Sequence, residues 1–481
     1  MFKRILIFLG AALLILIVVV LFNTLTFKSK QLNVEVATLP DNSADALPGL
    51  LGAIKFKTIS YNDQALFDSA QFNGFHRFLR RTYPLVHEKL SLKKIAEYSL
   101  LYKWEGSDPS LGPYVLMAHQ DVVPIEEESR NLWTVDPFEG VVKQDSIWGR
   151  GACDDKINLI GIMAAVEKLL KEGFQPKHTI YLAFGHDEEV GGTGAKAIAA
   201  ELKSQNVNAD LVIDEGGIVT MDKVPGMTKP VALIGTSEKG YVSVELKVEK
   251  NGGHSSMPQK ETALDILTKA VVTLREHQFP AHFTPSTEGF IEYVGPEMPF
   301  MQKMVFANTW LFKKVVIGIY ESSPGGNALV RTTSVPTIFH AGVKDNVVPT
   351  SVSATFNFRT LPGDSTAKVI EHVKKVINDD RVKISVLTGF QAEPTGITST
   401  DGPGYKLVDE TVHKIFRETV SAPFMMIGGT DSRHMEGISK NIIKFSPMID
   451  PVGFHGIDER VSVQSFRDTL WFFETLIRNA K

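Results

Sequence analysis

The sequence has almost no cysteine and no marked excess of charge. Its 481 residues contain one cysteine, Cys153, so a framework of disulfides within the chain is excluded. The formal net charge is −4 and we find no long basic run, which argues against nucleic acid as a partner. There is no internal repeat and no low-complexity segment. Apolar residues make up 43% and charged residues 22%, as in globular proteins, and the length exceeds what one hydrophobic core usually serves.

The only long apolar run opens the chain. Lys3 and Arg4 precede an uninterrupted apolar stretch over residues 5–22, and the next charge is Lys28. About 20 helical residues cross a bilayer core. Because no small-x-small cleavage site follows, we prefer an uncleaved transmembrane signal anchor to a removed signal peptide; a buried core helix is the third interpretation. We therefore expect a single-pass membrane protein whose folded part is extracytoplasmic or lumenal, or else a secreted protein. The orientation is only weakly specified, because Lys28 and Lys30 lie on the far side of the run.

After about residue 46, short apolar runs alternate with longer amphipathic segments. This pattern predicts an α/β sheet covered on both faces, in which ligands bind at the carboxyl ends of the strands. The predicted strands include Tyr114–Ala118, Thr179–Phe184 and Asp210–Ile213, and the predicted helices include Ile157–Glu172 and Thr193–Ser204.

From about residue 236 to 395 the pattern changes to that of a compact α+β module inserted into the first domain. An aromatic, proline-bearing segment over residues 280–335 interrupts the module, and residues 396–481 return to the earlier pattern. The predicted elements of the module are strands Tyr241–Val248, Thr337–Val343, Ser353–Arg359 and Lys383–Leu387 and helices Glu261–Arg275 and Ser365–Asn378. The prediction is thus a discontinuous domain over 46–235 and 396–481 with an inserted module over 236–395.

Polar clusters follow the predicted strands of the first domain. His119 and Asp121 come after the first strand, three consecutive acids (Asp187, Glu188 and Glu189) after the second, and Asp214 with Glu215 after the third. Residues two apart in a strand point the same way, so Asp121 can orient a metal-bound His119. Each cluster alone has an ordinary explanation, such as a surface pair or a solvated acidic loop.

Two further clusters complete the set. Asp154 and Asp155 open a helix, where acids also serve as ordinary caps, and His455 lies near the C-terminus. Histidine and carboxylate ligands without a second cysteine exclude a thiolate-rich structural zinc site. Together they indicate a catalytic two-metal site with a bridging carboxylate.

At this point the sequence resembles the dizinc aminoacylase and carboxypeptidase family, which includes glutamate carboxypeptidase, aminoacylase and peptidase T. The similarity is greatest to the branch of carboxypeptidase S and the secreted N-fatty-acyl amino acid synthase/hydrolase. The resemblance runs from about residue 50 to 480 and rests on eight motifs in order, namely MAHQDVVP, GRGACDDK, GHDEEVGG, DEGG, NGGHSS, FRTLPGD, GGTDSRH and HGIDER.

The resemblance implies a zinc-peptidase catalytic domain, a ferredoxin-like inserted lid that also allows a homodimer, and two Zn²⁺ per subunit, with Co²⁺ or Mn²⁺ as substitutes. It implies that His119 and Asp214 bind one zinc, Glu189 and His455 the other, and Asp154 both. Glu188 is the expected general base and Asp121 orients His119. His254 is expected to stabilise the oxyanion, and Arg359 and Asn346 to contact substrate.

The function implied is cleavage of the amide bond of N-acyl amino acids or of the C-terminal peptide bond of short peptides, including reversible N-fatty-acyl amino acid synthesis. The alternative is a metal-free receptor or scaffold that retains the fold. The acyl group, the amino acid and the direction of reaction stay open. Aromatic residues of the 280–335 segment suit an acyl channel, a lid core or a membrane-facing patch.

Overall fold

The central feature of the computed structural model is an eight-stranded sheet with the order β1-β2-β6-β3-β7-β16-β8-β15. The structure describes residues 1–37 and 43–480. Strands β6, β3, β7 and β16 run parallel to one another, and β15 runs parallel to β8. The strands are β1 (Ser91–Ile95), β2 (Ser99–Trp104), β3 (Tyr114–His119), β6 (Ile180–Gly185), β7 (Leu211–Thr220), β8 (Val231–Glu238), β15 (Val420–Met426) and β16 (Ile442–Ile449).

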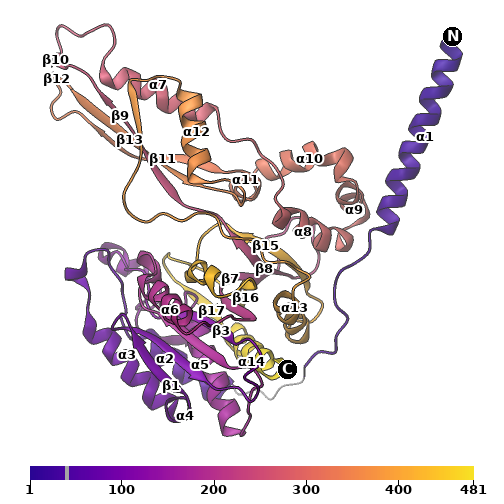
Figure 1. Cartoon of the computed structure of the whole chain (residues 1–481), viewed down its shortest axis with the longest axis vertical. Coiled ribbons are helices and arrows are strands. Elements are labelled where there is room, and N and C mark those ends of the chain that lie inside the picture. The colour runs from indigo at the N-terminus through magenta and orange to yellow at the C-terminus, as the bar shows by residue number, and fades with distance from the viewer. Residues whose placement is uncertain (38–42, 481) are drawn as a thin grey trace.

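Helices cover both faces of this sheet, as Figure 1 shows. Alternate residues of β3 explain why. Leu116 and Ala118 belong to the core that contains α5, whereas Val115 and Met117 belong to the core that contains α6. A strand buried on both faces reads as a continuous apolar run, so the predicted run was correct. The helices here are α2 (Ser43–Ile54), α3 (Ser69–Thr82), α4 (Pro84–Lys89), α5 (Lys156–Lys171), α6 (Thr193–Ser204), α13 (Pro403–Ile415) and α14 (Val463–Asn479).

A second, antiparallel sheet with the order β11-β13-β9-β14 lies away from the first and has its own hydrophobic core. Helices α7 and α12 pack on it. Its elements are β9 (Val242–Glu249), α7 (Ala263–Glu276), β11 (Thr333–Ala341), β13 (Ser351–Arg359), α12 (Thr366–Ile377) and β14 (Val382–Val386), and a short pair, β10 (Gly253–His254) and β12 (Val347–Val348), lies at its far end. A small sheet of β4 (Val141–Lys143), β5 (Ser146–Trp148) and β17 (Arg460–Ser462) completes the strands.

The segment predicted only as an aromatic insertion is helical. It forms α8 (Pro285–Val294), α9 (Phe300–Ala307), α10 (Thr309–Glu321) and α11 (Pro324–Val330). Rings of Phe290 in α8 and Phe424 in β15 lie 6.5 Å apart, so α8 attaches the insertion to the edge of the large sheet.

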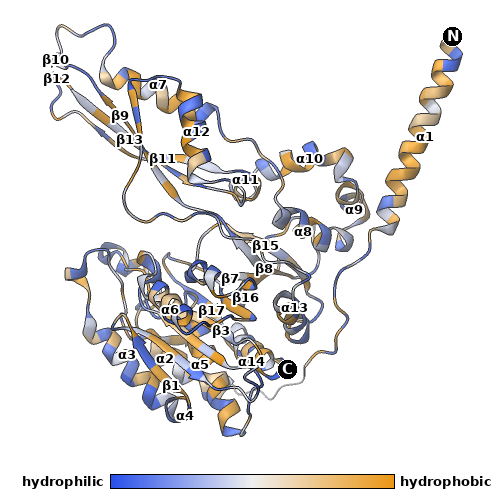
Figure 2. Ribbon diagram, viewed as in Figure 1, coloured by the Kyte–Doolittle hydropathy of each residue, from blue (hydrophilic) through white to orange (hydrophobic). Residues whose placement is uncertain are grey.

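The N-terminal apolar run forms one helix, α1 (Phe2–Thr26), that projects from the body of the molecule. Its length and composition suffice to cross a membrane, and its apolar window is not buried within the described structure. The apolar colour covers almost its whole length in Figure 2.

Candidate metal centre

The polar clusters meet at the carboxyl edge of the large sheet. His119 is the last residue of β3, and Glu188 and Glu189 lie in the 3-10 turn η3 (Glu188–Val190) that follows β6. Asp154 precedes α5, and His455 lies in the loop between β16 and β17 with a φ of 54°. Parallel strands bring their carboxyl ends to one edge, which is why residues this far apart in the sequence converge.

Asp154 lies between the two histidines. Its Oδ1 is 2.8 Å from Nε2 of His119, and its Oδ2 is 2.9 Å from Nε2 of His455. Oε2 of Glu189 is 3.3 Å from the same nitrogen of His455. A carboxylate that presents one oxygen to each of two imidazoles has the geometry of a ligand shared by two cations.

The structure places Glu215, rather than the predicted ligand Asp214, next to His119. Asp214 accepts hydrogen bonds from the backbone N–H groups of Glu215 (3.0 Å) and Ser432 (2.7 Å), and no contact joins it to His119 among the described residues. Oε1 of Glu215 instead lies 3.4 Å from Nε2 of His119. Both residues lie inside β7, which continues to Thr220 rather than ending before Asp214, and successive side chains of a strand point in opposite directions.

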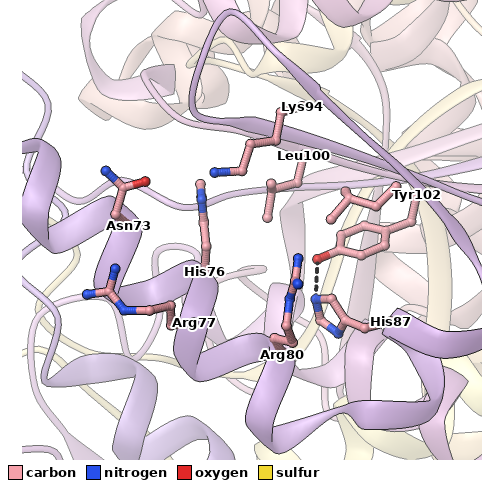
Figure 3. A pocket seen from close by; sticks show the side chains of 9 residues that line it. Asn73, His76, Arg77, Arg80, His87, Lys94, Leu100 and Tyr102 are labelled. Atoms are coloured by element: carbon pink, nitrogen blue, oxygen red, sulfur yellow. Dashed lines mark hydrogen bonds between the residues drawn. The ribbon is translucent and has the colours of Figure 1, made fainter.

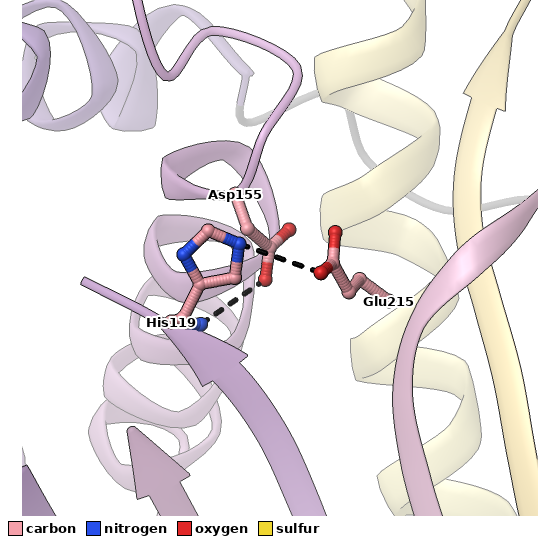
Figure 4. A group of neighbouring side chains, drawn as sticks. All are labelled: His119, Asp155 and Glu215. Carbon is pink, nitrogen blue, oxygen red and sulfur yellow. Dashed lines mark hydrogen bonds and ion pairs between the residues drawn. The ribbon is translucent and has the colours of Figure 1, made fainter. Parts of the chain in front are cut away.

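Two groups of side chains have ligand atoms close enough to hold a cation. His119, Asp154 and Glu189 form one group, and His119, Asp155 and Glu215 form the other (Figure 4), with the ligand atoms of each group within 4.8 Å of one another. Asp155 has other partners, since it accepts the backbone N–H of His119 (3.3 Å) and the side-chain amide of Asn158 (2.5 Å). We therefore regard Asp155 as support for the site rather than as a ligand.

Asp121 lies behind His119. Its Oδ1 is 3.2 Å from Nδ1 of His119, as expected for a carboxylate that orients a ligand imidazole. Asp121 also accepts the backbone N–H groups of Glu188 and Glu189, each at 3.1 Å, and the hydroxyl of Ser60 at 2.5 Å. One carboxylate thus fixes both the imidazole and the turn that carries the two glutamates. Ser60 carried no signal in the sequence.

The negative charge of the site perturbs its titratable groups. Burial alone lowers the pKa of His119, but Glu215, Asp121 and Asp154 outweigh it and raise that pKa well above the usual value. Hydrogen bonds with Asp154 and Glu189 raise the pKa of His455 to about 10. Burial raises the pKa of the Glu215 carboxyl to about 8. A divalent cation bound among these carboxylates would displace such protons and balance the negative charge.

The residues fit a metal pair. Oε1 of Glu189 is buried and has no hydrogen-bond partner in the part of the chain that the structure describes. A buried carboxylate oxygen without a partner is costly unless a cation or water satisfies it. The donor set is imidazole and carboxylate, which suits zinc in an open catalytic site. Cys153 is buried, and its thiol donates a hydrogen bond to the backbone carbonyl of Arg460 at 3.1 Å.

Glu188 lies beside this centre, and burial raises its pKa well above the usual value. Its Oε1 is 4.0 Å from a guanidinium nitrogen of Arg433. Arg433 stacks on Phe390, with 5.1 Å from the guanidinium carbon to the ring centroid. Arg433 belongs to the motif GGTDSRH, which is the sequence signal that could have drawn attention to it, but no role was predicted for it.

The predicted substrate residues divide into two sets. Arg359 is the last residue of β13, and its guanidinium carbon lies 4.5 Å from the centre of the Tyr241 ring. Burial lowers the pKa of Arg359, and the charge of Arg433 lowers it further. His254 and Asn346 are exposed at the far end of the inserted sheet, where the carbonyl of Asn346 accepts the N–H of Ser255. Figure 1 places β10 and β12 there, far from β3. The structure therefore does not bring His254 or Asn346 to the metal centre.

A cavity of about 200 Å³ lies elsewhere, between α3, α4 and the β1-β2 hairpin (Figure 3). Arg77, Arg80 and Lys94 line it together with His76, whose Nε2 donates to Gln120 at 2.7 Å. It contains none of the residues of the metal centre. Its small volume and basic lining distinguish it from the site described above.

Comparisons with known proteins agree with this geometry. The model of peptidase family M20/M25/M40 matches residues 115–479. The probable carboxypeptidase S-like 2 of Dictyostelium discoideum is 40% identical and the match covers 97% of this chain and 92% of that protein. The N-fatty-acyl-amino acid synthase/hydrolase of Homo sapiens is 38% identical over 90% of this chain and 87% of that protein.

The fold is also that of solved structures. The M20 family metallo-carboxypeptidase of Sulfolobus solfataricus superposes with a TM-score of 0.67 at 19% identity, covering 91% of this chain and 99% of that one. At this identity the likeness concerns the fold alone. The mixed α/β fold predicted from the sequence is therefore confirmed, and so is the predicted family.

Proposed function

Because this chain belongs to peptidase family M20/M25/M40 and is a hydrolase of amide bonds in N-acyl amino acids or peptides, we propose that it works with two zinc ions. The observation that carries the proposal is Asp154, which presents one oxygen to each of His119 and His455. Glu215, in place of Asp214, would complete the subsite of His119. Glu189 would complete the subsite of His455.

The metal ions would supply Lewis acidity that brings the pKa of a bound water toward neutrality and polarises the scissile carbonyl. Cobalt or manganese suits the same imidazole and carboxylate donors. The ligand His119 is held by a second contact in the chain, from Asp121, so its imidazole is oriented before metal enters.

Glu188 is the proposed general base. It takes a proton from the attacking water and returns it to the leaving amine, so no net proton is consumed within the cycle. Its burial explains why its carboxyl favours the protonated state, which a neighbouring cation would counter. Its backbone N–H is fixed by Asp121, which places the carboxylate beside the metal subsites.

The substrate would present a free carboxylate to Arg359. A guanidinium can bind a carboxylate through two parallel hydrogen bonds. Arg433 adds a second positive charge near Arg359, and the rings of Tyr241 and Phe390 offer apolar surface beside both. This combination favours an acylated amino acid with an apolar acyl group over a polar peptide.

A homodimer would explain the position of His254. Strand β11 is an edge of the inserted sheet and exposes Ile338 and Phe339, which are 47% and 55% accessible. An exposed apolar edge strand is a template for pairing with another chain. Such pairing, with movement of the inserted lid, could carry His254 and Asn346 of one copy toward the metal centre of another, where His254 would stabilise the oxyanion.

The domain limits of this proposal are 46–235 and 396–481 for the catalytic domain and 236–395 for the lid. The separate core of the inserted sheet supports them. Residues 38–42 precede the catalytic domain, and they and its last residue, 481, lie outside the described residues. Helix α1 would anchor the protein in a membrane with the catalytic domain on the extracytoplasmic or lumenal side, since Lys3 and Arg4 favour a cytoplasmic N-terminus.

The test is a hydrolysis screen of the full chain in detergent. N-acyl amino acids with short and long acyl groups, the corresponding amino acid amides and dipeptides would be compared before and after a strong zinc chelator, with zinc restored as the control. We expect release of free amino acid from acylated substrates, loss with chelator and recovery with zinc. Full activity after complete removal of metal would overturn the proposal.

A further inference from the structure

Helix α1 does not project freely from its last turn, because one of its faces packs on the helical insertion. Thr24 of α1 is buried. Four further residues of α1 and its C-cap are half-buried and recur at helical spacing on one side, namely Leu16, Val20, Asn23 and Phe27. The insertion meets them mainly through α9. Apart from Lys3, Arg4 and Thr26, the remaining residues of α1 are exposed and apolar.

Asn308, at the junction of α9 and α10, is the centre of this contact. Its side-chain amide donates to the carbonyl of Val20 (3.1 Å) and to the hydroxyl of Thr24 (3.3 Å), and it accepts from the amide of Asn23 (3.0 Å). Asn308 is fully buried. At 1.5 Å per residue, Val20 lies only about 3 Å along the helix from the end of the apolar run at Phe22. The α9–α10 junction is thus level with the point where α1 would leave a bilayer.

Helix α10 presents a second apolar face next to that point. Leu311, Val315 and Ile319 are four residues apart, so they lie on one side of the helix, and they are 42%, 55% and 63% accessible. Trp310, at the start of α10, and Phe300 and Met301, at the start of α9, are at least half exposed. We call these six residues the α9–α10 face. Figure 2 shows apolar colour on part of α10 and along α1.

The insertion is attached to the catalytic sheet, so this face has a defined orientation. Ser286 of α8 shares a hydrogen bond with Ser237 of β8 (2.8 Å), and the ring of Tyr293 lies 6.0 Å from that of Tyr405. Lys30, just beyond α1, pairs with Glu292 at 2.5 Å. Helix α1, the insertion and the sheet are therefore linked by specific contacts.

We propose that the α9–α10 face inserts shallowly into the same bilayer that α1 crosses and holds the catalytic domain against the membrane surface. The proposal rests on the membrane anchoring proposed above. Six exposed apolar side chains are costly in water, and the bilayer is the apolar phase that α1 itself requires at this level. Trp310 suits the interface, where amphipathic rings collect, and Lys303 and Lys314 of the same two helices can meet lipid phosphates.

The chain offers a matched control for the test. Val272 in α7 is also an exposed helical valine (48%, against 55% for Val315), and it lies in the inserted sheet domain away from α1. The native Cys153 is buried, so a single introduced cysteine can carry a label. Leu14, 63% exposed in α1, reports on the anchor itself.

The full chain would be reconstituted in vesicles of phosphatidylcholine with a minor share of phosphatidylglycerol. An environment-sensitive fluorophore would be placed on Leu14→Cys, Val315→Cys or Val272→Cys, and quenched by lipids with a nitroxide near the headgroup or deep in the acyl chain. At position 14 we expect quenching by the deep nitroxide. At position 315 we expect quenching by the headgroup nitroxide that is several times stronger than at position 272. A fourth label, on Trp310→Cys, should also be quenched by the headgroup nitroxide and should lose this quenching when Val315→Glu and Ile319→Glu are added.

Each other outcome overturns something definite. Quenching at 14 without quenching at 315 keeps the anchor and refutes the docking face. Equal quenching at 315 and 272 means unspecific adsorption and refutes it as well. No quenching at 14 refutes the anchor and this inference together, while hydrolysis measured on the same samples reports separately on the proposed chemistry.

Discussion

Nε2 of His119 and Oε1 of Glu215 lie 3.4 Å apart at the carboxyl edge of the large sheet. The neighbouring Asp214 has both carboxylate oxygens occupied by backbone N–H groups. We therefore propose different roles for the two adjacent acids, with Glu215 as a metal ligand and Asp214 as a support of the fold. This difference can be measured with two conservative substitutions of the same kind.

Glu215→Gln is expected to empty the subsite of His119, because a neutral amide is a poor zinc ligand. The loss of affinity should exceed the roughly 10–100-fold seen when only a group behind a ligand is changed. Elemental analysis after dialysis and competition with a chromogenic chelator would measure it. The matched variant Asp214→Asn should retain both ions and mainly lower stability; the reverse pattern would restore Asp214 as the ligand.

Asp121→Asn is expected to lower metal affinity and activity roughly 10–100-fold, the range found for carboxylates that orient a ligand histidine. The amide cannot carry the charge that holds the His119 imidazole, and it can accept fewer of the four contacts that Asp121 makes. Ser60→Ala removes one of those contacts and serves as the mild control. Wild-type zinc affinity in Asp121→Asn would contradict the orienting role.

Glu188→Gln tests the base. Turnover should fall roughly 10²–10⁴-fold, the usual contribution of a positioned proton-transfer group. The metal content should stay at the wild-type value, because no imidazole of the centre contacts Glu188 among the described ion pairs. Measuring kcat and bound zinc on one sample separates the two effects. A variant with kcat within tenfold of wild type would remove Glu188 from the mechanism.

Arg359→Met keeps the bulk of the side chain that stacks on Tyr241 but removes its charge. KM should rise about 10-fold or more for substrates with a free carboxylate, with little change for their amides, since a charge-assisted hydrogen bond contributes about 1.5–3 kcal/mol. Arg433→Met is the comparison, because Arg433 lies near Glu188 and should also change kcat. Equal losses on acids and amides would argue against a carboxylate anchor.

Strong local patterns made much of the fold predictable. The apolar run Tyr114–Ala118 and helix Ile157–Glu172 match β3 and α5 to within a residue or so. The inserted sheet was predicted strand by strand, although β11 begins at Thr333, four residues before its predicted start. Alternating and continuous apolar runs are signals that one sequence contains.

The features that the sequence could not predict depend on contacts between residues that are distant in the chain. The DEGG motif has the composition of a loop, yet β7 continues through it because β16 pairs with Gly217 and Val219. That extension decides which of Asp214 and Glu215 faces His119. Ser60 and Arg433 likewise gain their roles only from neighbours distant in the sequence. The prediction considered the apolar residues of the insertion only as an acyl channel, a lid core or a membrane-facing patch. It did not test whether they recur at helical spacing, so the four helices were missed.

A buried acid far from the metal centre gives the final prediction, on pH. Asp468 in α14 is 4% accessible, and burial raises its pKa to about 6 although Gln464 donates a hydrogen bond to it at 2.7 Å. The folded protein thus holds this proton more tightly than the unfolded chain. The contribution of Asp468 to stability is full below pH 4 and is lost as the pH rises through 6, a difference on the order of 3 kcal/mol at about 1.4 kcal/mol per pKa unit. Asp468→Asn, which stays neutral, should therefore unfold at higher urea than wild type at pH 7, and this advantage should vanish near pH 4. Asp380→Asn, at an exposed position, should show no such dependence, and an advantage of Asp468→Asn that is equal at both pH values would point to packing rather than ionisation.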